Sequence, residues 1–165
     1  PGPVLHWSDR VGRHNNIFRM PKFRSMRVGT PAVATHLLQD PDAWLTPIGA
    51  FLRKTSLDEL PQLWSILVGD MSIVGPRPLL KEYLTLYNTR QARRHEVRPG
   101  ITGLAQVNGR NGLNWQQKLE YDTWYVENVS LLLDIRIILR TICRVFCREG
   151  INSPKAATME PFKGT

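Results

Sequence analysis

Two adjacent carboxylates, Asp58 and Glu59, are the residues of this sequence best suited to chemistry. They lie within residues 56–62, with basic Arg53 shortly before them and Arg77 after a short apolar stretch. Paired carboxylates can hold a divalent cation, and a guanidinium group matches the oxygens of a phosphate. This combination of residue types indicates phosphoryl-transfer chemistry.

A capping box is the alternative interpretation of the same residues. Ser56 and Glu59 have the spacing at which a serine caps a helix and a glutamate returns to the serine backbone. Both acids would then only stabilise the helix, by their favourable interaction with the positive end of its dipole. The local sequence leaves both interpretations open, so the basic residues around the acids have to decide between them.

Arg77 is the most constrained of these basic residues, because it stands between Pro76 and Pro78. The two prolines restrict the backbone, and the guanidinium can therefore be aimed at a phosphate at low entropic cost. Lys22 and Arg24 occupy alternate positions of an extended segment and project to one side. We expect Lys22, Arg24 and Arg53 to lower the pKa of Asp58 or to hold a diphosphate.

The helices and strands that must position these residues can be predicted from the sequence pattern. They form one mainly helical α+β domain over residues 1–165, with a small β-hairpin and amphipathic surface helices. Residues 29–45 are expected to be a variable excursion, and residues 151–165 an irregular tail. The expected elements are a hairpin within 4–28 turning near 12–16, a helix over 47–54 capped by Thr46, a helix beginning at Ser56, a strand over 71–74, a helix over 79–95, glycine-rich loops over 98–113, and helices over 114–127 and 131–148 capped by Asn114 and Ser130.

Two of these helices have faces that bear on function. In the helix that begins at Ser56, apolar side chains share one face and are expected to anchor it, so that the acids face a cleft. The helix over 131–148 carries arginines at four-residue spacing opposite an apolar face that includes Leu132, Ile135 and Leu139. That pattern suits the headgroup region of an anionic membrane, or equally a core-facing helix with a solvated stripe.

The composition points to an anionic partner. The chain has 165 residues, a net charge of +8 and a pI of about 10.0. A nucleic-acid-binding module is one candidate, but the sequence has neither an aromatic strand motif nor an evident recognition helix. A non-catalytic scaffold on a membrane surface is another. We find no signal peptide and no apolar stretch long enough to cross a bilayer.

Several motifs together resemble the monotopic bacterial sugar transferases, which are polyprenyl-phosphate phosphoglycosyl transferases. The matching stretches follow the order of that family and cover nearly the whole chain; they are residues 22–26 (KFRSM), 56–63 (SLDELPQL), 69–78 (GDMSIVGPRP), 98–111 (RPGITGLAQVNGRN) and 125–128 (YVEN). In size and tail the chain is most similar to the small initiating enzyme of bacterial N-linked glycosylation. Members of the family begin with a re-entrant membrane segment, which we expect to be absent from this chain.

The resemblance implies a specific reaction. A UDP-sugar would donate its phospho-sugar to undecaprenyl phosphate at the cytoplasmic face of the bacterial inner membrane and release UMP. Asp58 matches the nucleophile that forms a covalent phospho-sugar intermediate, and Glu59 its partner in binding Mg²⁺. Arg77, Lys22 and Arg53 match phosphate-binding positions. The further basic candidates are Arg24 and Arg110.

Overall fold

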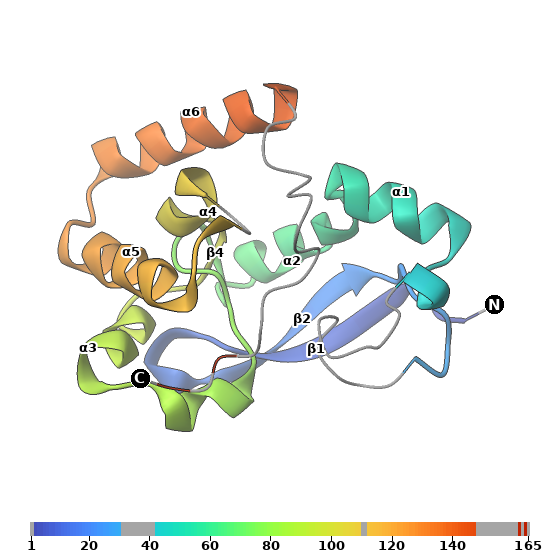
Figure 1. The fold of residues 1–165 in the computed structure, drawn as a ribbon, viewed down its shortest axis with the longest axis horizontal. Coiled ribbons are helices and arrows are strands. Elements are labelled where there is room, and N and C mark those ends of the chain that lie inside the picture. Colours follow the sequence, from blue (N-terminus) through green and yellow to red (C-terminus); the bar gives the residue numbers. More distant parts are fainter. Residues whose placement is uncertain (1, 31–41, 110–111, 148–161, 163, 165) are drawn as a thin grey trace.

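The computed structural model describes residues 2–30, 42–109, 112–147, 162 and 164, and Figure 1 shows its arrangement. Helices and two small sheets form a mixed α+β domain, as predicted. The strands are β1 (Leu5–Val11), β2 (Ile17–Phe23), β3 (Ser72–Val74) and β4 (Gly100–Thr102), and the α-helices are α1 (Pro47–Thr55), α2 (Gln62–Leu67), α3 (Thr89–Ala92), α4 (Leu104–Asn108), α5 (Trp115–Glu127) and α6 (Leu131–Cys147).

The predicted hairpin is confirmed, because β1 and β2 pair antiparallel through their whole length. The turn between them places His14 and Asn15 at positive φ, the left-handed region that asparagine tolerates well. Pro21 lies opposite Trp7. In a two-stranded sheet each strand is an edge, so the missing N–H of a proline can be accommodated there.

The sequence did not predict the second sheet, in which β3 and β4 run parallel. We expected residues 98–113 to be loops, but Gly100–Thr102 is a strand and Leu104–Asn108 a helix. Glycine is required here for packing. A Cβ at Gly75 would come within 2.4 Å of the Arg98 carbonyl oxygen, and one at Gly100 within 2.1 Å of the Gly75 nitrogen. The glycines therefore mark close backbone approach between the two segments.

Three helix starts were predicted correctly from their caps. The Thr46 side chain accepts a hydrogen bond from the Gly49 N–H, with Pro47 in the first turn of α1. Asn114 and Gln117 form a reciprocal capping box at the start of α5. Ser130 Oγ accepts from the Leu133 N–H, 3.3 Å away, at the start of α6.

The single helix predicted over 79–95 is wrong. The segment instead comprises 3₁₀ turns at Lys81–Leu86 and Arg93–His95 on either side of the short helix α3. The backbone is extended at Tyr87 and Asn88, where Asn88 caps α3 by a capping box with Gln91. A local cap has therefore started a new helix where the periodic pattern alone predicted a continuous one.

Buried apolar side chains gather in three clusters. Ile137 of α6 packs with Val74, Leu104, Val107 and Tyr125, while Phe18 and Met20 of β2 pack with Met71. In the third cluster Phe162, from the expected irregular tail, is 5% exposed and packs with Tyr83 and Leu119. Within the described residues, none of the helices combines the length and the apolar character that crossing a bilayer requires.

The faces of α2 are the reverse of those we predicted. Gln62 and Ser65 are buried at 2% and 1% exposure. Leu63, Trp64 and Leu67 are exposed, at 50%, 60% and 79%. The expectation that the leucines anchor the helix is therefore wrong. The exposed apolar side chains continue onto α1 at Ile48 and Phe51.

Candidate active site

Asp58 and Glu59 lie in a 3₁₀ turn, Leu57–Glu59, between α1 and α2. The capping-box interpretation is wrong, because Ser56 adopts a left-handed conformation (φ 58°, ψ 16°) and its side chain makes no cap hydrogen bond. Ser56 instead ends α1, and its N–H donates to the Arg53 carbonyl. The Glu59 side chain is therefore not directed to Ser56 and can make contacts elsewhere.

Glu59 is held between two cations. Lys22 Nζ donates to Glu59 Oε1 at 2.9 Å, and Arg77 Nη2 donates to the same oxygen while its Nη1 lies 3.4 Å from Oε2. Burial acts to raise the pKa of Glu59, but the charges of Arg77 and Lys22 outweigh it and hold that pKa well below its usual value. Glu59 is thus ionised and joins the hairpin to the Pro76–Arg77–Pro78 segment.

The neighbouring Asp58 is in a different environment. It is 9% exposed, and its carboxylate has no hydrogen bond or ion pair with any residue that the structure describes. Burial raises the pKa of Asp58, and this outweighs the opposing charges of Lys22 and Arg53. The two cations therefore do act to lower this pKa, as expected, but what the sequence did not predict is the larger opposing effect of burial. Two adjacent carboxylates with pKa values pushed apart can take different roles in a reaction.

The remaining predicted basic residues differ in how they are placed relative to the two acids. Arg53 donates from Nε to Ser25 Oγ at 3.0 Å, and its charge acts on Asp58. Arg24 donates from Nε to the Pro3 carbonyl at 2.8 Å, and it forms no hydrogen bond or ion pair with either acid. Arg110 lies outside the described residues. The structure thus brings Lys22, Arg53 and Arg77 together around Asp58 and Glu59, and their roles stay predictions.

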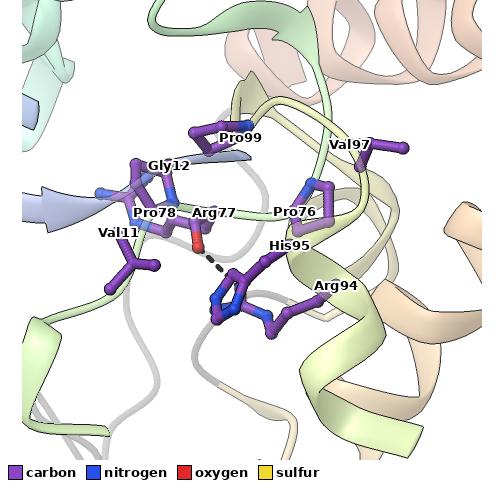
Figure 2. A pocket seen from close by; sticks show the side chains of 9 residues that line it. All are labelled: Val11, Gly12, Pro76, Arg77, Pro78, Arg94, His95, Val97 and Pro99. Atoms are coloured by element: carbon purple, nitrogen blue, oxygen red, sulfur yellow. Dashed lines mark hydrogen bonds between the residues drawn. The ribbon is translucent and has the colours of Figure 1, made fainter. Parts of the chain in front are cut away.

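The backbone of Arg77 is fixed by a residue that sequence reasoning did not single out, Arg94. Its Nη2 donates to the Arg77 carbonyl at 2.7 Å, as the dashed line in Figure 2 shows. Arg94 is 2% exposed and forms an ion pair with buried Asp122 of α5, at 2.8 Å. Its Nη1 also lies 3.3 Å from the Tyr87 hydroxyl. A charged residue on the buried face of a helix, as Asp122 is, was the available signal for this pair.

Figure 2 also shows a small pocket beside this arrangement, lined by Val11 and Gly12 of the hairpin, Pro76, Arg77 and Pro78, and the side chain of His95. His95 is 7% exposed, and neither ring nitrogen has a hydrogen-bond partner among the described residues. Burial and the charge of Arg94 lower the pKa of His95 to about 4. The imidazole is therefore neutral near pH 7.

The carboxylate oxygens of Asp58 and Glu59 are the candidate metal ligands of this site. Nowhere in the described residues do three or more His, Cys, Asp or Glu side chains gather in a way that could hold a metal ion. Mg²⁺, however, is commonly held by one or two carboxylates together with substrate phosphates and water. Asp58, which has no hydrogen-bond or ion-pair partner in the part of the chain that the structure describes, and Glu59 beside it fit that second kind of site.

Comparisons with known proteins identify the family of the chain. A family model described as bacterial sugar transferase matches residues 1–148. The chain is 48% identical over 163 residues to an uncharacterized sugar transferase, EpsL, of Bacillus subtilis, covering 99% of this chain and 80% of that protein. It is 42% identical over 164 residues to an undecaprenyl-phosphate galactose phosphotransferase of Salmonella typhimurium, covering 90% of this chain and 34% of the relative.

A third relative, from Aeromonas hydrophila, is named UDP-N-acetylgalactosamine-undecaprenyl-phosphate N-acetylgalactosaminephosphotransferase. The identity is 40% over 156 residues, which cover 91% of this chain and 37% of the relative. The chain therefore spans most of the Bacillus protein but only about a third of the other two.

Proposed function

The chain belongs to the bacterial sugar transferase family and is an enzyme of the phosphoglycosyl transferase class, and we propose that it transfers a phospho-sugar from a UDP-sugar to undecaprenyl phosphate. The family resemblance stated from the motifs is confirmed. The finer likeness to the initiating enzyme of N-linked glycosylation stays a prediction. The names of the relatives support the kind of donor and acceptor, and the site supports the chemistry.

The difference between the two acids carries the proposed mechanism. Glu59 is paired with Lys22 and Arg77, whereas Asp58 is buried and its carboxylate has no partner among the described residues. Asp58 can therefore act as the nucleophile: its oxygen attacks the phosphorus that carries the sugar, the bond to UMP breaks, and UMP leaves. An oxygen of the polyprenyl phosphate then attacks the same phosphorus and releases the Asp58 carboxylate.

Lys22 and Arg77 are suited to hold the diphosphate during these steps. Both already bind an oxyanion, the Glu59 carboxylate, and phosphate oxygens of the donor can take its place. We propose that Asp58 and Glu59 also hold Mg²⁺, which when bound would neutralise charge on the diphosphate. Arg53 adds positive charge beside Asp58.

Intact-protein mass spectrometry tests the covalent step. We expect the wild-type protein, after acid quenching from a mixture with Mg²⁺ and each of several UDP-sugars, to gain the mass of one sugar phosphate. Asp58→Asn should not gain it, because an amide is a poor nucleophile. Asp70→Asn, which removes an exposed carboxylate in the loop after α2, should behave as wild type. An adduct of unchanged abundance in the Asp58→Asn protein would show that another residue is the nucleophile.

We also propose that the domain docks on an anionic membrane surface at the cytoplasmic face of the inner membrane. The apolar face of α6 that the sequence identified is exposed, with Leu132 at 59% and Leu139 at 58%, while Ile137 packs into the core. Figure 1 shows α6 and α1 along one side of the molecule. Apolar side chains of α1 and α2 are exposed as well, among them Phe51 and Trp64. Exposed apolar surface of this kind marks an interaction site.

Sedimentation with vesicles tests this docking. Trp64→Ser should reduce the fraction of protein that pellets with vesicles containing anionic lipid, because an exposed indole on α2 would be lost from the docking surface. Trp124→Ser removes an indole of similar exposure (47%) from α5 and serves as the matched control. Equal sedimentation of all three proteins would contradict docking through α2.

A further inference from the structure

Arg10 of β1 points to the same side of the hairpin as Lys22. Residues directly opposite in an antiparallel pair share a face, and the register pairs Arg10 with Phe18 and His6 with Lys22. Positions two apart on a strand also share a face, so Phe18 and Lys22 of β2 lie on one side. Arg10 therefore belongs to the face that carries the contact with Glu59.

The end of β1 is also tied to the chain that follows Arg77. The Val11 N–H donates to the Leu79 carbonyl at 3.2 Å, and Asp9 lies 3.7 Å from Lys81 Nζ. Val11 lines the same pocket as Arg77, and Figure 2 shows them near one another. Contacts on both sides of Arg10 thus hold it next to the Pro76–Arg77–Pro78 segment.

Arg10 differs from the other guanidinium groups of this region in its partners. Arg77 and Arg94 each form an ion pair with a carboxylate, whereas the contact found for Arg10 in the described part of the chain is from its Nε to Ser8 Oγ, at 3.2 Å. Burial and the charge of Arg77 lower the pKa of Arg10 to about 10, although Glu82 and Glu59 oppose this. A partly buried cation beside another cation is unfavourable until an anion joins them.

Charge balance points to the nature of that anion. Lys22, Arg53 and Arg77 surround the two carboxylates Asp58 and Glu59, and Arg10 brings a further positive charge. The surplus suits phosphate, whose oxygens can accept from two guanidinium groups at once.

Resting on the proposed function, we infer that Arg10 and Arg77 together bind a phosphate group of a substrate, which makes Arg10 a further binding residue of the active site. The group is either a phosphate of the nucleotide donor or the phosphate of the polyprenyl acceptor. In both cases Arg10 contacts the phosphate from the hairpin side and Arg77 from the opposite segment. The same anion would thereby relieve the repulsion between the two guanidinium groups.

Equilibrium binding without turnover tests the inference. UMP and a short-chain polyprenyl phosphate in detergent are titrated separately against wild type, Arg10→Gln and Arg19→Gln. Arg19 is the matched control, because it lies exposed on β2, with its guanidinium over the Trp7 ring. We expect Arg10→Gln to weaken binding of at least one probe by about tenfold or more, as loss of a charge-assisted contact does.

The probe that loses affinity identifies the source of the phosphate: UMP for the donor, the lipid for the acceptor, and both for a shared position. Unchanged binding of both probes by Arg10→Gln would overturn the inference. Thermal unfolding in phosphate-free buffer gives a second readout. The melting temperature of Arg10→Gln should equal or exceed that of wild type, because the charge removed is partly buried and has no ion pair with any described residue. A clear fall would show a structural role and also overturn the inference. Neither measurement depends on an Asp58 adduct, so failure of the proposed covalent step would be seen separately.

Discussion

Replacing Arg94 by methionine should be among the most damaging single changes near the site. Arg94 makes four hydrogen bonds, two to Asp122, one to the Arg77 carbonyl and one to the Tyr87 hydroxyl. In Arg94→Met the Asp122 carboxylate stays buried without a partner. Removing one member of a buried ion pair costs about 3–5 kcal/mol, a large part of the roughly 5–15 kcal/mol that stabilises a typical domain.

Urea unfolding followed by tryptophan fluorescence measures this loss. Arg93→Met is the matched control, because Arg93 is the adjacent arginine and its ion pairs with Glu96 and Glu127 are on the surface. It should change the free energy of unfolding little. If Arg94→Met costs no more than Arg93→Met, the buried pair does not hold this region together and the reasoning is wrong.

A double variant separates stability from positioning. Arg94→Met with Asp122→Leu removes both charges, and apolar replacements of buried pairs are often neutral or stabilising by about 1–4 kcal/mol. The double variant should therefore regain most of the lost stability. Transferase activity should stay low, because the Arg77 carbonyl still lacks its donor. Full activity in a stable double variant would show that Arg94 does not position Arg77.

Three further changes probe other parts of the structure. Gly75→Ala should lower the free energy of unfolding by about 1–3 kcal/mol through overpacking, whereas Gly112→Ala, which meets open space, should change it by less than about 0.5 kcal/mol in the same urea titration. The pKa of His95 is 6.5 in the unfolded chain and about 4 in the folded protein, so the free energy of unfolding should be unaffected by this residue above pH 6.5 and should fall as the pH drops toward 4. In His95→Phe the free energy of unfolding should depend less on pH over this range, and an unchanged slope would contradict the reasoning. The pKa of Glu59 is depressed in the folded state, so its contribution is present above pH 4.5 and lost as the pH falls further; the difference in unfolding free energy between wild type and Glu59→Gln should shrink over that range.

Local signals predicted the elements whose ends are defined by nearby residues. Thr46 with Pro47, and Asn114 with Gln117, fix helix starts by contacts within one turn. The hairpin likewise depends on a short turn. Caps and turns of this kind are encoded locally, and the family motifs identified the class of enzyme.

Features that depend on distant contacts were missed. The strand Gly100–Thr102 exists because it pairs with Ser72–Val74, and Gly100 and Gly75 allow the two segments to approach closely. The amphipathic pattern of α2 was recognised, but periodicity cannot say which face meets the protein. The pKa of Asp58 depends on how deeply the whole fold buries it, and that burial outweighs the neighbouring cations visible in the sequence.

The position of Phe162 limits where the protein can be shortened. Its ring lies 5.9 Å from that of Tyr83, 5.6 Å from that of Tyr87 and 5.4 Å from that of Trp115, centroid to centroid. Tyr87 in turn contacts Arg94, which holds the Arg77 carbonyl. Ending the expressed chain at Cys147, where α6 ends, would remove Phe162, uncover these rings and loosen the support of the Arg77 backbone.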